Sequence, residues 1–146
     1  MFYKRINIKY VLLILTLGFI WGQSILPKAI SSAESNHVLS LMEPLFYLIF
    51  SSGVITEHLI RKIAHFCEFA FLGFQLYCLP SFDKRSFRNS ACLAFFSAFL
   101  DESIQMLSDR GDQISDVWLD FSGALFGIVF AMLILFLIAW HRSKQK

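Results

Sequence analysis

A run of ionisable residues opens an otherwise apolar segment, RKIAHFCEFAFLGF at 61–74. Arg61, His65 and Glu68 are spaced four and three residues apart, which places them on one face of a helix. One ion in the middle of a lipid-embedded helix costs about 2.5 to 3.5 kcal/mol. Such residues are therefore expected to pair with one another or to serve a function.

Two later segments carry acidic and amide residues in the same pattern. Asp101 and Gln105 are four residues apart, and so are Asp116 and Asp120, while Glu102 directly follows Asp101. Each set can share a helix face that avoids lipid. The sequence predicts that these faces meet in one polar pocket, whose members are Arg61, Lys62, His65, Glu68, Asp101, Glu102, Gln105, Arg110, Asp116 and Asp120.

The residue types suggest two kinds of role in this pocket. The candidate catalytic residues are His65 as general base, Glu68 as its orienting group or as an acid, and the adjacent carboxyls of Asp101 and Glu102 as a proton donor. Ser103 lies beside these acids, but in no recognisable nucleophile motif. The candidate ligand-binding residues, whose cations could hold a phosphate or carboxylate, are Arg61, Lys62, Gln105, Arg110, Asp116 and Asp120.

Two other interpretations of the same residues remain. A metal site could use His65, Glu68, Asp101, Glu102 and Asp120, a set that suits zinc or manganese. Because Arg61 and Lys62 would compete for the same carboxylates, no metal and no cofactor is expected. In a purely structural interpretation, pairs such as Arg61 with Asp116 or Lys62 with Asp120 would hold the helices together.

The composition indicates an integral membrane protein. Of the 146 residues 56% are hydrophobic, 16% are charged, and 17 are phenylalanine. The sequence predicts an all-α fold: one domain, 1–146, forming a membrane four-helix bundle with spans at 10–26, 61–79, 90–107 and 118–140. The first span lacks a convincing cleavage site and is expected to be retained. Gly123 and Gly127 are expected to serve helix packing. No nucleic-acid motif is present in the sequence.

Basic residues predict the orientation. With four spans and the N-terminus inside, nine basic residues fall on the cytoplasmic side and four outside, which accounts for all 13. The protein is therefore expected to be a multi-pass cell-membrane protein with both termini cytoplasmic. The apolar stretch 38–50 is too short to span, and is expected to be a re-entrant or interfacial helix, a lid on the outer face, with SSAESN at 31–36 supplying its caps.

Three stretches carry a family resemblance: WGQSILPKAISSAES, RKIAHFCEFAFLG and DESIQMLSDRGDQISDVWLDFSGALFG. They resemble the VanZ-like membrane proteins over 21–130, and the polar positions of the predicted pocket match. That family is named for a teicoplanin-resistance accessory protein of Gram-positive bacteria. The resemblance implies a role at the cell envelope, in glycopeptide resistance or near it. Ile104 stands where members often have a histidine.

The sequence thus favours an outward-facing site for an anionic envelope ligand. The expected partners are membrane lipids or a lipid-linked envelope precursor, such as a phospholipid, a wall precursor or a teichoic-acid-type lipid. The alternative is a non-enzymatic scaffold that binds a partner and whose charged cluster is structural. A transporter is disfavoured because the inner halves of the predicted spans lack ionisable residues. Whether a bond is made or broken is left open.

Overall fold

The computed structural model describes residues 8–50, 56–79, 87–108 and 114–145. Within these ranges the chain forms five α-helices and no strand, which confirms the all-α prediction. The helices are α1 Ile8–Ile25, α2 Lys28–Phe50, α3 Glu57–Cys78, α4 Phe87–Leu107 and α5 Ile114–Ser143.

Two helices in the described part of the chain are long and apolar enough to cross a membrane. They are Ile8–Ile25, which covers the predicted span at 10–26 except for its last residue, and Ser115–Ser143, which contains the predicted span at 118–140. The helices α3 and α4 do not meet the same measure, because they carry the ionisable residues of the predicted pocket. Length and composition therefore support two of the four predicted spans.

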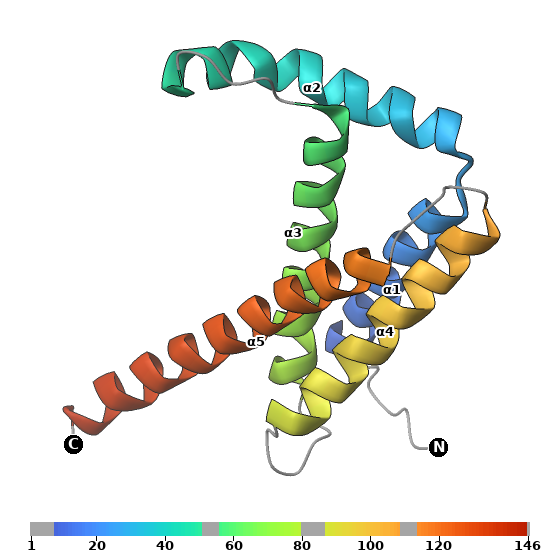
Figure 1. The fold of residues 1–146 in the computed structure, drawn as a ribbon. Coiled ribbons are helices and arrows are strands. Elements are labelled where there is room, and N and C mark those ends of the chain that lie inside the picture. Colours follow the sequence, from blue (N-terminus) through green and yellow to red (C-terminus); the bar gives the residue numbers. More distant parts are fainter. Residues whose placement is uncertain (1–7, 51–55, 80–86, 109–113, 146) are drawn as a thin grey trace.

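The helix α2 differs from the predicted short lid. It has 23 residues and starts at Lys28, ten residues before the predicted segment. The stretch SSAESN lies inside this helix, so its predicted role as a cap was wrong. Pro27 instead directly precedes the helix, and its carbonyl accepts a hydrogen bond from the Ser31 backbone N–H at 3.2 Å. In Figure 1, α2 lies across one end of α3, and its main packing partner is α3.

The most extensive helix contact joins α3 and α5. It is built on close backbone approach: a Cβ added at Gly73 would meet the backbone carbonyl of Ala124, and one added at Gly127 would meet that of Ala70. Gly123 approaches the backbone of Phe66 in the same way. The predicted packing role of Gly123 and Gly127 is confirmed, because only a residue without a side chain allows the helices to lie this close.

The directions of α1, α3, α4 and α5 place one end of each of these helices in the same region of the molecule. Contacts between α3 and α5 advance together along both helices, so the two helices start at the same end (Figure 1). Conversely, Lys9 near the start of α1 donates to the carbonyl of Cys78 at the end of α3, at 3.1 Å. As a result, α1 and α4 end where α3 and α5 begin. The apolar core lies between these helices and includes Ile20, Phe69, Leu72 and Ala98.

Candidate functional site

The most deeply buried acid of the predicted pocket is Asp101. It has no exposed surface, and its carboxylate accepts hydrogen bonds from two side chains. The hydroxyl of Ser24, from the last turn of α1, donates to Oδ1, and the amide of Gln105, one turn later on α4, donates to Oδ2. The aspartate is thus held in one orientation by two helices. Gln105 was a predicted site residue, whereas Ser24 was not.

His65 lies between two buried aspartates. Its Nδ1 atom is 3.9 Å from Oδ2 of Asp101 and 4.0 Å from Oδ1 of Asp120, which is 2% exposed. These contacts bring α3, α4 and α5 together at one point. The structure therefore joins three residues that the sequence placed in one pocket, although they are up to 55 positions apart.

The two cations of the cluster that the structure describes have partners other than those expected. Lys62 Nζ forms an ion pair with Asp116 Oδ1 at 3.1 Å, at the partly exposed edge of the cluster. Arg61 Nη2 donates to Nδ1 of His58 at 3.3 Å. The expected pairs of Arg61 with Asp116 and of Lys62 with Asp120 were therefore wrong, because Lys62 rather than Arg61 faces the start of α5.

Arg61 retains an unused donor. Its Nη1 atom is buried and has no hydrogen-bond partner among the described residues. Arg61 and His65 line a cavity of 170 Å³ between α1, α2 and α3, whose other polar lining residues are Gln23, Ser31, Glu34, Ser35 and Glu68. They also line a cavity of 20 Å³ that reaches Gln105, Asp116 and Asp120. Arg61 and His65 thus separate two polar spaces.

Glu68 lies one turn beyond His65. It lines both the 170 Å³ cavity and a cavity of 410 Å³ beside α1, next to Thr16 and Ile20. Its Oε2 atom is buried without a hydrogen-bond partner in the described part of the chain, and no hydrogen bond joins it to His65 there. The structure thus places Glu68 in the pocket wall rather than as the group that orients His65.

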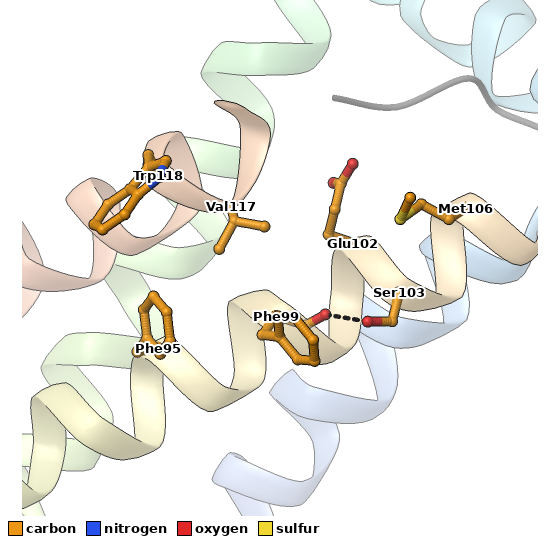
Figure 2. A pocket seen from close by; sticks show the side chains of 7 residues that line it. All are labelled: Phe95, Phe99, Glu102, Ser103, Met106, Val117 and Trp118. Carbon is orange, nitrogen blue, oxygen red and sulfur yellow. Dashed lines mark hydrogen bonds between the residues drawn. The ribbon is translucent and has the colours of Figure 1, made fainter. Parts of the chain in front are cut away.

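Glu102 faces a different space. It is 3% exposed and lines a cavity of 280 Å³ between α4 and α5, together with Phe95, Phe99, Met106 and Trp118. Figure 2 shows its carboxylate projecting from α4 beside Val117 of α5, among apolar side chains. Glu102 is therefore adjacent to the polar cluster without lining the cavities around His65. Ser103 donates to the carbonyl of Phe99 at 2.7 Å, as an ordinary helical serine does (Figure 2).

One predicted residue cannot be placed, because Arg110 lies outside the described residues. Among those described, His65, Asp101 and Asp120 offer ligand atoms that all lie within 4.8 Å of one another, a spacing compatible with a metal ion. His58 and Ser24 are site residues that the sequence analysis missed. Ser24 stands four residues after a buried core residue, Ile20, and helical spacing alone could have placed it on the inward face.

These features define a class: an all-α protein with apolar helices of membrane-spanning length and a buried cluster of ionisable residues. The VanZ/LLP1 family model matches residues 9–137, nearly the whole chain, and the chain belongs to this family. The matched region contains every predicted site residue. Comparisons with curated proteins and with solved structures found no match.

Proposed function

We propose that this chain is a cell-envelope membrane protein whose polar pocket binds the anionic head group of a lipid or of a lipid-linked wall precursor. Through that ligand it would contribute to glycopeptide resistance, including resistance to teicoplanin. The proposal rests mainly on one observation, the buried Nη1 of Arg61 in the wall of the 170 Å³ cavity. A guanidinium N–H that is shielded from water and lacks an acceptor is strongly favoured to bind an anion.

The lining of the cavity suggests the type of head group. The hydroxyls of Ser31 and Ser35 and the amide of Gln23 can donate to phosphate oxygens. The carboxylates of Glu34 and Glu68 accept hydrogen bonds, and would repel a second phosphate beside them. In a phosphate attached to a sugar or to another hydroxyl-bearing group, the phosphate oxygens can accept from the donors of this lining and the hydroxyls can donate to its carboxylates. A lipid-linked glycan therefore fits better than a bare phosphate.

The family and the charge distribution support a particular topology for this function. In it, α1, α3, α4 and α5 span the membrane, both termini are cytoplasmic and α2 lies on the outer face. Four consecutive spans alternate in direction, which agrees with α1 and α4 ending where α3 and α5 begin. Cysteine labelling tests it, in a cysteine-free background and in intact cells. A cysteine at Glu43 should react with an impermeant reagent, and one at Ser143 should not.

Binding to a head group can be measured directly. The full chain, purified in detergent, would be titrated with a phosphate-linked glycolipid whose binding is followed by native mass spectrometry. The Arg61→Gln variant should bind at least about tenfold more weakly, since a charge-assisted hydrogen bond contributes about 1.5 to 3 kcal/mol. Arg142→Gln, an exposed change at the other end of α5, is the control and should bind like the unchanged protein. Equal affinity in Arg61→Gln would refute the proposal.

A second candidate function is a scaffold that acts through a partner protein. It is favoured by the ion pair of Lys62 with Asp116, which links α3 to α5 without any ligand. The two functions differ in what they require of Arg61. A scaffold needs a folded chain at normal abundance, so teicoplanin tolerance should be retained in Arg61→Gln cells. A head-group site needs the guanidinium itself, so tolerance should be lost at unchanged abundance.

A further inference from the structure

Among the described residues, the cluster contains more carboxylates than cations. In the described part of the chain two cations, Arg61 and Lys62, stand beside five carboxylates, those of Glu68, Asp101, Glu102, Asp116 and Asp120. Lys62 is engaged by Asp116 at the edge of the cluster. Charge in a protein interior is costly unless it is paired or bound to a metal ion. A deeply buried carboxylate that has no donor of its own among the described residues is therefore a candidate to bind a cation.

Asp120 is such a carboxylate. It is 2% exposed, and within the described residues its carboxylate accepts no hydrogen bond. Its Oδ1 atom lies 4.0 Å from His65 Nδ1. Asp101, by contrast, has two hydrogen-bond donors. A buried carboxylate without a donor, directed at an imidazole nitrogen and a second carboxylate, has the surroundings of a metal ligand.

We propose that His65, Asp101 and Asp120 bind one divalent transition-metal ion. Their ligand atoms lie within 4.8 Å of one another. Metal–ligand bonds of about 2.0 to 2.2 Å place neighbouring ligand atoms about 3.0 to 3.5 Å apart, so small side-chain movements complete the site. An imidazole with two carboxylates suits zinc or manganese. This inference goes beyond the proposed function and does not require it.

The surroundings of the three residues support a metal site in two ways. The hydrogen bonds from Ser24 and Gln105 fix the Asp101 carboxylate, as outer hydrogen bonds do for metal-binding carboxylates. The sequence predicted that Arg61 and Lys62 would compete with a metal ion for these carboxylates. In the structure Arg61 contacts His58 and Lys62 contacts Asp116 instead. Three protein ligands leave coordination positions open, and His65 also lines the 170 Å³ cavity, from which an anionic group can reach a bound ion.

The test is a metal titration of the full chain in detergent after treatment with EDTA. Manganese(II) would be added, and the free ion followed by its electron paramagnetic resonance signal, with zinc(II) measured by competition. We expect one ion per chain. Asp120→Asn and His65→Ala should each weaken binding by more than about tenfold. Loss of a residue that only hydrogen-bonds to a metal ligand already weakens metal binding by about that factor, and loss of a ligand should cost more. The matched control is Glu57→Gln, an acidic residue in the first turn of α3 and outside the cluster, whose affinity should be unchanged.

Two further measurements make the result unambiguous. Ser24→Ala leaves all three ligands in place and should weaken binding about 10- to 100-fold by freeing Asp101. Circular dichroism and gel filtration establish that each variant is folded. If the folded, unchanged protein binds neither ion up to about 1 mM manganese or zinc, the metal site is refuted. Equal affinities in the unchanged protein and in folded Asp120→Asn would refute it too.

The metal site and the head-group site can fail separately. Glycolipid binding would be measured in EDTA and again with manganese. Binding that persists in EDTA, in a protein that takes up no metal, would refute the metal site alone. Metal uptake without glycolipid binding would refute the head-group site alone.

Discussion

The helices α3 and α5 meet in two regions of opposite character. Toward the middle of both helices the contact is apolar, and Gly73, Gly123 and Gly127 let backbone touch backbone. One turn nearer their starts, the same helices face each other through His65 and Asp120, at 4.0 Å. The glycine contact fixes the distance between α3 and α5. That distance in turn determines how closely His65 and Asp120 approach each other. The comparison shows that the glycines position ionisable groups that they do not touch.

The largest effect is expected in the tight region. Gly127→Leu places a side chain where the backbone of Ala70 already lies, so the helices must separate or fail to pack. Overpacking usually costs about 1 to 3 kcal/mol, and because this side chain would meet backbone we expect the upper end of that range or loss of monodisperse protein in gel filtration. The control is Gly22→Leu on α1, where a side chain would meet nothing within 4 Å. A Gly127→Leu variant that melts like the unchanged protein would show that the glycine contact does not set the helix spacing.

A smaller effect is expected where the polar region is buried. Asp101→Ala removes the acceptor of the Gln105 amide, whereas the Ser24 hydroxyl can still donate to the carbonyl of Ile20 at 3.1 Å. Leaving one buried donor unsatisfied costs about 1 to 3 kcal/mol, so the melting temperature in detergent should fall by several degrees. Asp101→Asn keeps an acceptor oxygen and should lose less. If the alanine and asparagine variants both have the melting temperature of the unchanged protein, the hydrogen bonds at Asp101 contribute nothing to stability.

The smallest effect belongs to the exposed edge of the polar region. Lys62→Asp alone opposes Asp116 with a like charge, and the exchange Lys62→Asp with Asp116→Lys restores an ion pair. Because the pair is partly exposed, thermal melts should show a coupling of about 0.2 to 1 kcal/mol. Full recovery of stability together with full teicoplanin tolerance supports a structural role for this pair. Recovery of stability without tolerance would place Lys62 in the ligand site.

Much of this arrangement could be predicted from sequence. Helical spacing placed His65 on the face of Arg61, and the cost of ions in lipid predicted that it would meet Asp101 and Asp120, as the structure shows. The small-residue spacing of Gly123 and Gly127 predicted a close helix contact. These inferences succeed because periodicity and charge determine which face of a helix is turned inward.

The individual partners could not be predicted. Whether Arg61 or Lys62 meets Asp116 depends on the angle at which α3 and α5 cross, and periodicity carries no information on that angle. Ser24 was missed because a single serine in a last helical turn has the pattern of an ordinary helix end. The length of α2 was underestimated although Pro27 marks its start, because the polar residues that follow were interpreted as caps rather than as one side of a helix.

The position of α2 has a consequence for how tightly any ligand is held. One wall of the 170 Å³ cavity, including Ser31 and Ser35, belongs to α2, whose main support is α3. The opposite wall, with Arg61 and His65, belongs to α3 itself. A molecule that touches both walls adds its own contacts to the interface between the two helices. Occupancy and helix docking are then thermodynamically linked, so amide hydrogen exchange in α2 reports ligand binding and slows as the cavity fills.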